Sequence, residues 1–294
     1  MFDLPPRLKW LEESSDGREW LRQLPAHVST CVDRWSLRLE PPYPTSNVSI
    51  VFPVTVADGA PAVLKIQFPH PECAHEAEAL RCWNGQGAVQ LFADDPAHHA
   101  LLMERCDPGG PLSVIDPDEA MEILIELLPR LWVSADKGVS ADKPFQSLHD
   151  ESTGWLEQLP SSWERAGRPF EIELLNAALQ ALDSLCRTQG EQVLVNQDLH
   201  GDNVLQATRE PWLVIDPKPL VGEREFALAP IIRAYEFGHS RKCAIKRLDK
   251  LTSGLGLDRE RARFWTLAQT LAWAFAGDHA IERHVETARW LWHA

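Results

Sequence analysis

Two runs of alternating apolar residues, joined by an Asp-Gly pair, set the strongest limit on what this chain can fold into. Every even position of 48–56 is apolar, and 62–68 repeats the alternation. Successive side chains of a strand point to opposite faces, so a period of two predicts half-buried strands. Asp58-Gly59 is a strong signal for a tight turn. The segment is therefore predicted to form a β-hairpin.

The rest of the first third predicts a small sheet that carries one helix. A stretch rich in Ala, Glu and Leu follows a proline and predicts a helix from about Glu72 to Trp83. Apolar runs in 88–95 and 98–106 predict two more strands. Pro, Gly and Asp then dominate 106–119, as in a linker. We therefore expect a β-rich N-terminal lobe over 1–105 and a second lobe over 106–294.

The second lobe is predicted to be mostly helical. Apolar residues recur at helical spacing in 118–132, 170–186 and 258–292. Within 192–216, by contrast, three short apolar runs alternate with polar turns and predict short strands. The fold class we expect is α+β.

Composition limits the partners and the compartment. The 29 Lys and Arg against 43 Asp and Glu give a net charge of −14, which disfavours nucleic acid and anionic membranes and favours a cationic small molecule. The six cysteines form no CxxC pair, as expected of reduced thiols in the cytoplasm. We find no signal-peptide pattern and no apolar run of membrane-spanning length.

A polar cluster inside 193–206, followed by an aspartate at the end of an apolar run, carries the chemistry. Asp198 and Asn203 lie in the cluster, and Asp216 ends the run WLVID. Phosphoryl transfer needs a carboxylate beside the acceptor hydroxyl and oxygen ligands that hold Mg²⁺ against nucleotide phosphates. This set of side chains provides both.

These residues resemble the aminoglycoside phosphotransferase family, whose loop reads HGDLHxxN and is followed by a metal-binding aspartate. The segment DPKPLVGERE from Asp216 is similar to the streptomycin and hydroxyurea phosphotransferase branch. The resemblance implies a protein-kinase-like, two-lobed fold and an antibiotic-resistance kinase that uses ATP and Mg²⁺. It also implies that Asp198 is the catalytic base, that Asn203 and Asp216 are metal ligands, and that His200 supports the loop.

The resemblance extends to the nucleotide site. Lys65 is on a predicted strand and Glu76 on the following helix, in the order of a phosphate-binding lysine and its glutamate partner. Glu76 is preferred over Glu78, which would face another side of the helix. Further nucleotide contacts are expected from the phosphate-covering loop and the hinge, at Ser46, Met103, Glu104 and Cys106.

The loop departs from the family pattern in two places. Asn196 and Gln197 stand where the family has His-Gly, and Ala227 stands where it usually has an aspartate that braces the loop. Two alternatives to an aminoglycoside kinase such as a streptomycin kinase therefore stay open. One is a kinase of hydroxyurea or another small metabolite, and the other is a catalytically degenerate nucleotide-binding protein. For the acceptor we expect contacts from Glu223, Trp273, Asp278 and Glu282.

Overall fold

The chain forms two compact units in the computed structural model, which describes residues 2–70, 73–134 and 145–294. The first unit comprises residues 1–109 together with 207–213, and the second comprises 110–206 and 214–294. Within the described ranges, every helix is too short or too polar to cross a lipid bilayer.

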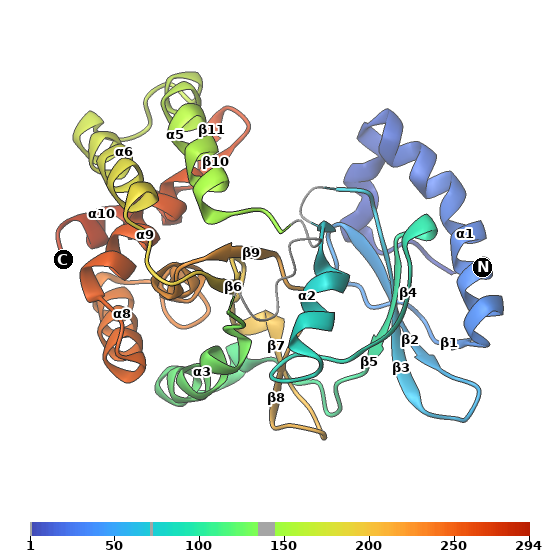
Figure 1. Cartoon of the computed structure of the whole chain (residues 1–294). Helices are drawn as coiled ribbons and strands as arrows, with labels where there is room; N and C mark the ends of the chain where they lie inside the picture. The colour runs from blue at the N-terminus through green and yellow to red at the C-terminus, as the bar shows by residue number, and fades with distance from the viewer. Residues whose placement is uncertain (1, 71–72, 135–144) are drawn as a thin grey trace. The chain divides into compact units, whose positions relative to one another are not determined.

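The first unit contains a five-stranded antiparallel sheet, with the order β1-β2-β3-β5-β4 (Figure 1). The predicted hairpin is its centre: β2 pairs with β3 across the turn at Gly59, whose φ of 89° suits a residue without a Cβ. The strands are β1 (Arg38–Leu39), β2 (Ser49–Thr55), β3 (Pro61–Gln67), β4 (Leu91–Asp95) and β5 (Ala100–Glu104).

The two faces of this sheet pack against different helices (Figure 1). Ala62, Leu64 and Ile66 of β3 are fully buried in a core that α1 (Ser15–Trp35) completes through residues such as Trp20. The alternate residues of β3 face α2 (Glu76–Trp83). The period of two thus places Lys65 on the face opposite the main core. The expected start of this helix, Glu72, lies outside the described residues.

The second unit is mainly helical, as expected. α9 is its central helix: it is buried along most of its length and packs against α6, α7 and α10. The described helices are α3 (Pro117–Leu131), α5 (Leu148–Arg165), α6 (Ile172–Arg187), α7 (Ala229–Arg233), α8 (Arg241–Leu255), α9 (Arg259–Ala272) and α10 (Glu282–Trp292).

Short strands in this unit hold the polar cluster. β6 (Val193–Asn196) pairs antiparallel with β9 (Pro219–Gly222), a strand that the sequence pattern did not predict. This pairing brings the start of the cluster beside the segment that follows Asp216. The other strands of this unit are β7 (Val204–Gln206), β10 (Phe275–Ala276) and β11 (His279–Ala280), and β8 (Trp212–Val214) begins in the first unit and ends in the second.

Candidate active site

The polar loop after β6 is held in one conformation by its own backbone and by Asn196. The Asn196 Oδ1 accepts hydrogen bonds from two backbone N–H groups, of Asp198 at 3.1 Å and of Lys218 at 3.0 Å. The Gln197 N–H donates to the Lys218 carbonyl at 3.0 Å. Asn196 is 3% exposed, so these bonds are sheltered from water. One of the two departures from the family pattern is thus an asparagine that joins the loop to the segment after Asp216.

Asp198 and Asn203 are linked across the loop. The Asn203 Nδ2 donates to the Asp198 carbonyl at 3.1 Å, which leaves the amide oxygen of Asn203 as its acceptor group. The Ile215 N–H donates to the Asn203 carbonyl at 2.9 Å, so Asp216, the next residue, is held beside Asn203. An amide oxygen and a carboxylate on adjacent segments suit a hard cation such as Mg²⁺, which takes one or two protein ligands and completes its shell with phosphate and water.

Gly201 allows a close approach in this loop. A Cβ at this position would lie 2.6 Å from Cζ of Phe237 and 3.0 Å from the backbone of Ser113. The Gly201 N–H donates to Glu236 at 2.7 Å, and the Nδ1 of His200 accepts from the Asp202 N–H at 3.3 Å. His200 therefore caps the 3₁₀ turn that carries Asn203, a supporting position in agreement with the expectation.

A buried amide on α9 braces the same loop from the other side. The Gln269 Nε2 donates to the Gln197 carbonyl at 3.1 Å, and its Oε1 accepts from Arg233 at 3.2 Å. Gln269 is fully buried and Arg233 is 7% exposed. Ala227, where the family usually has a bracing aspartate, is buried and has no polar side chain to offer. Gln269 thus supplies a brace that the sequence pattern did not reveal, because it lies 72 positions from Gln197.

We expect Gln269→Leu to weaken this brace. The Gln197 carbonyl and the Arg233 guanidinium would both lose a partner, and an unsatisfied buried group costs about 1–3 kcal/mol. Urea unfolding should therefore detect a loss of stability of that order. The same substitution at Gln158, an exposed residue of α5, is the control and should change stability by less than about 0.5 kcal/mol. Equal effects of the two substitutions would contradict the brace.

The first unit holds the predicted lysine and glutamate as an ion pair. The Lys65 Nζ lies 2.6 Å from Oε2 of Glu76, and the Gln67 Nε2 donates to the same oxygen at 2.6 Å. The side chains of Lys65 and Glu76 are 5% and 2% exposed, respectively. Glu78 instead pairs with Arg81 at the surface, at 3.5 Å. The geometry therefore selects Glu76 over Glu78 as the partner of Lys65.

The expected hinge residues differ in whether their groups are already engaged in contacts within the protein. Met103 is buried within β5, and the Glu104 N–H already donates to the Gln90 carbonyl at 2.9 Å. The Glu104 carboxylate is held by Arg209, with a shortest distance of 2.8 Å. Cys106 lies beyond the end of β5, and burial raises the pKa of its thiol to about 12. Of the three, Cys106 is thus the one outside the strand ladder.

Arg209 is a structural residue that the sequence pattern missed. Besides Glu104, its guanidinium donates to the carbonyls of Gly85 at 2.6 Å and Ala88 at 2.9 Å. It therefore fixes the connection between α2 and β4 to the end of β5. Ser46, from the expected phosphate-covering loop, lies just before β2, and its Oγ is 2.5 Å from that of Ser49.

The four expected acceptor residues occupy different environments. Glu223 is 1% exposed and its carboxylate is used internally, by Arg261 at 2.8 Å, the Gly190 N–H at 2.8 Å and the indole of Trp265. This burial leaves it no surface for an acceptor, so we drop it from the proposed acceptor site. Asp278 and Glu282 are exposed, and in the described part of the chain neither forms a hydrogen bond or ion pair with the loop. Trp273 lies near the loop, with the Lys218 Nζ 5.9 Å from its ring centroid.

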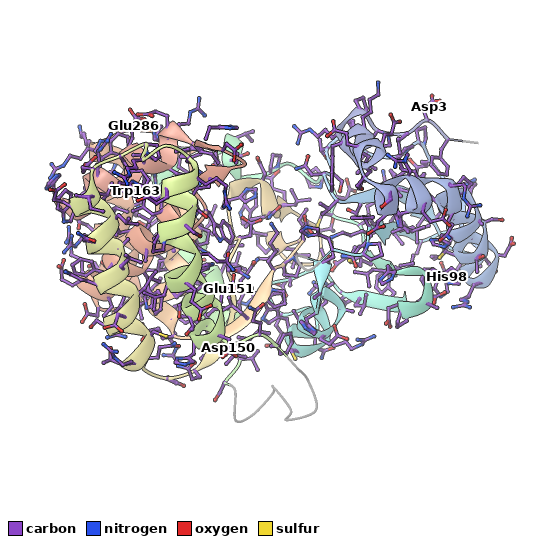
Figure 2. The ribbon with its side chains drawn as sticks, turned by 90° about the horizontal axis from the view of Figure 1, so that it is seen from above. Asp3, His98, Asp150, Glu151, Trp163 and Glu286 are labelled. Atoms are coloured by element: carbon purple, nitrogen blue, oxygen red, sulfur yellow. The ribbon has the colours of Figure 1, made fainter. Side chains whose placement is uncertain are left out.

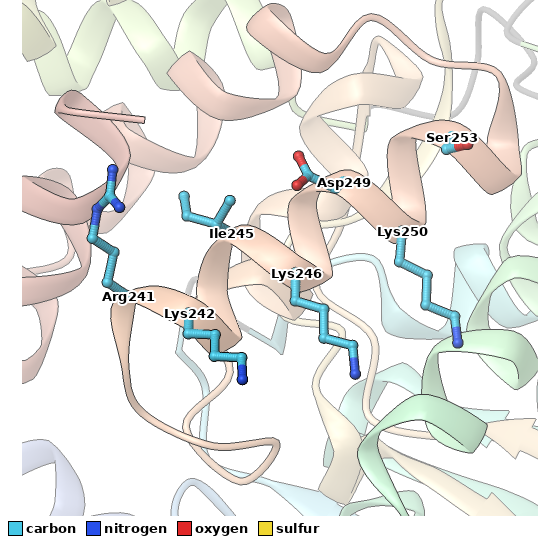
Figure 3. A pocket seen from close by; sticks show the side chains of 7 residues that line it. All are labelled: Arg241, Lys242, Ile245, Lys246, Asp249, Lys250 and Ser253. Carbon is cyan, nitrogen blue, oxygen red and sulfur yellow. The ribbon is translucent and has the colours of Figure 1, made fainter.

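A hollow runs along α8, and none of the residues that line it belongs to the loop (Figure 3). Its lysines at 242, 246 and 250 form one stripe along the helix. The Lys246 ammonium pairs with Asp118 at 2.6 Å and that of Lys250 pairs with Glu122 at 2.8 Å, both on α3. Two of the three lysines therefore form ion pairs between α8 and α3. The hollow contains no acid or amide of the loop, so we place the active site at Asp198. The hollow is lined by Arg241, Lys242, Ile245, Lys246, Asp249, Lys250 and Ser253.

Comparisons with known proteins identify the family of the chain. Residues 34–278 match the model of the aminoglycoside/hydroxyurea antibiotic resistance kinase family. A streptomycin 6-kinase from Streptomyces griseus is 40% identical over 262 residues, which cover 87% of this chain and 83% of the relative. A hydroxyurea phosphotransferase from Kitasatospora aureofaciens is 38% identical over 262 residues, with coverage of 87% and 73%.

The fold agrees as well. The crystal structure of a thermostable mutant of an aminoglycoside phosphotransferase, in a ternary complex with ADP and hygromycin B, superposes with a TM-score of 0.57 at 12% identity. The match covers 90% of this chain and 94% of that one. The expected α+β, protein-kinase-like fold is thereby confirmed, as is the resemblance found in the sequence. The chain belongs to the aminoglycoside/hydroxyurea antibiotic resistance kinase family.

Proposed function

We propose that this kinase transfers the γ-phosphoryl group of ATP, with Mg²⁺, to a hydroxyl of streptomycin. The observation that carries the proposal is the pairing of Asp198 with Asn203 and of Asn203 with Ile215, the residue before Asp216. In this arrangement Asp198 is the catalytic base, and the oxygens of Asn203 and Asp216 are the metal ligands. Mg²⁺ held by these residues would offset the negative charge of the nucleotide phosphates.

In the first unit, the Lys65 ammonium is proposed to contact the nucleotide phosphates, with Glu76 fixing its position. Ser46 would lie in the loop over the phosphates. Cys106 would contact the adenine through its main chain, while Met103 and Glu104 support that segment. The part of the chain that binds nucleotide is therefore proposed to be this unit.

Charge favours a cationic acceptor over a neutral one. The net charge of −14 raises the local concentration of a polycation such as streptomycin but not that of neutral hydroxyurea. Additional carboxylates stand at the start of α5, where Figure 2 labels Asp150 and Glu151. The Val221 N–H of β9 donates to the Gln146 carbonyl at 2.9 Å, so this end of α5 is held beside the strand that follows Lys218. Trp273, Asp278 and Glu282 remain in the proposal as acceptor contacts.

A panel of acceptors in an ADP-release assay tests the substrate. We expect the kcat/KM for streptomycin to exceed that for hydroxyurea. We also expect the KM for streptomycin to rise with ionic strength, because salt screens the attraction between exposed charges. The KM of a neutral acceptor is the control and should stay nearly constant. A higher kcat/KM for hydroxyurea, or for an unrelated hydroxyl compound, would overturn the choice of streptomycin.

A further inference from the structure

Lys218 carries a feature that the proposed roles leave unexplained. Its ammonium lies 2.9 Å from Oδ2 of Asp198, the proposed base. The two side chains are 22% and 21% exposed, so the pair is partly sheltered but open to small molecules from solvent. A lysine in contact with a catalytic carboxylate can assist that carboxylate, obstruct it, or form an ion pair with no effect on the reaction.

The backbone of Lys218 is fixed relative to the loop. Its N–H shares the Asn196 Oδ1 with the N–H of Asp198, and its carbonyl accepts from the Gln197 N–H. Two of these hydrogen bonds hold the loop and the Lys218 segment in one register, and the third orders the loop itself. The starting point of the lysine side chain is determined before any ligand binds, which lowers the entropic cost of its contact with Asp198.

The side chain of Lys218 is also supported. Its ammonium lies 5.9 Å from the ring centroid of Trp273, and the guanidinium of Arg233 lies 4.8 Å from that centroid. Arg233 is buried and also donates to Gln269, which braces the Gln197 carbonyl. The contacts therefore run from Asp198 through Lys218, Trp273, Arg233 and Gln269 and end at Gln197, the neighbour of Asp198.

We propose that Lys218 is a positioning residue for Asp198, an inference that rests on the proposed function. Lys218 holds Oδ2, so that Oδ1 faces the acceptor hydroxyl. In the reaction the acceptor oxygen forms a bond to the γ-phosphorus, and its proton passes to Asp198. The bond between the γ-phosphorus and the β,γ-bridging oxygen breaks, and ADP leaves with that electron pair. Lys218 stays an ammonium throughout, and it prevents the carboxylate from turning away from the hydroxyl.

Two other readings make different predictions. If the contact is an ordinary exposed ion pair, it contributes about 0–1 kcal/mol to stability and nothing to turnover. If it obstructs the base until a cationic acceptor displaces the lysine, its removal would lower the KM for the acceptor or raise kcat. The positioning role instead predicts a lower kcat, because a small misplacement of a reacting group can cost on the order of 10²-fold in rate.

The test compares Lys218→Met, Lys218→Arg and Lys250→Met in steady-state kinetics with ATP and the best acceptor of the panel. Lys250 is a matched control: its side chain is 24% exposed and its ammonium lies 2.8 Å from a carboxylate, that of Glu122. We expect Lys218→Met to lower kcat by about 10- to 100-fold, with the KM for ATP changed by less than about twofold and the melting temperature close to that of the wild type. Lys218→Arg, which keeps the charge, should recover much of the loss, and Lys250→Met should match the wild type.

Several results would overturn the inference. An unchanged kcat in Lys218→Met, an equal loss in Lys250→Met, or an effect confined to KM would each exclude a positioning role. No recovery in Lys218→Arg would also count against it. These results leave the proposed function intact if the wild type transfers phosphate. A wild type inactive on every acceptor would instead overturn both proposals.

Discussion

Replacing Asp198 by asparagine should lower kcat for phosphoryl transfer by about 10²–10⁴-fold, the range expected for loss of a general base. Asparagine keeps the shape of the side chain but neither accepts the hydroxyl proton nor pairs with the Lys218 ammonium, which lies 2.9 Å away. The loop bonds through the Asp198 backbone, to Asn196 and Asn203, do not depend on its carboxylate. Nucleotide binding should therefore persist, and calorimetry with an ATP analogue can measure it beside the kinetics.

Asp202→Asn is the matched control for this substitution. Asp202 lies in the same loop, and its carboxylate accepts a hydrogen bond from Ser113 instead of facing Lys218. We expect its kcat to stay within a few-fold of the wild type. If Asp202→Asn lost as much activity as Asp198→Asn, the loss would reflect damage to the loop, and the assignment of the base would be wrong.

Substitution of Glu76 by alanine should destabilise the first unit by about 3–5 kcal/mol, because it removes the carboxylate that pairs with the buried Lys65 ammonium at 2.6 Å. The double variant Lys65→Met, Glu76→Leu removes both charges and should recover most of this stability. Its activity should not recover, because the proposed phosphate contact is gone. Urea unfolding and ATP-dependent turnover of the single and double variants separate the two effects.

Glu78→Ala provides the comparison on the same helix. Glu78 pairs with Arg81 at 3.5 Å, with both side chains more than a third exposed, so its loss should cost less than about 1 kcal/mol. If the Lys65→Met, Glu76→Leu double variant kept wild-type turnover, Lys65 would have no role in the reaction. A Glu76→Ala variant as stable as the wild type would contradict the buried pair.

The sheet of the first unit could be predicted from the sequence because one face of β2 and β3 is apolar. The alternation in 48–56 and 62–68 marks β2 and β3, and it also identifies the face on which Lys65 lies. The preceding helix, α1, was not predicted. It contains Gly17 and Pro25, which weaken a local helical signal, and it is stabilised by packing of residues such as Trp20 and Leu24 against the sheet.

In the candidate site, too, some features could be predicted from the sequence and others could not. Asp198, Asn203 and Asp216 could be predicted because they lie close together in sequence and fall in one pattern of residue types. Gln269 could not, because it contacts the loop only once α9 is packed against the rest of the second unit. The burial of Glu223 could not be predicted either, because Arg261 and Trp265 contact its carboxylate only in the folded chain.

Contacts in the folded chain also explain how the loop is held despite its two departures from the family pattern. A loop that begins Asn-Gln in place of His-Gly keeps its register through the side chain of Asn196, and the missing carboxylate at Ala227 is matched by an amide from α9. These contacts keep the loop ordered around Asp198, which favours a catalytic protein over a degenerate one.

The most direct test is to isolate the product formed from streptomycin and ATP by the wild type and to determine its structure by mass spectrometry and phosphorus NMR. The proposed function predicts a streptomycin monophosphate, with one hydroxyl of the antibiotic esterified. Formation should require Mg²⁺ and be lost in Asp198→Asn. Unmodified streptomycin after prolonged incubation with active, nucleotide-binding protein would contradict the account.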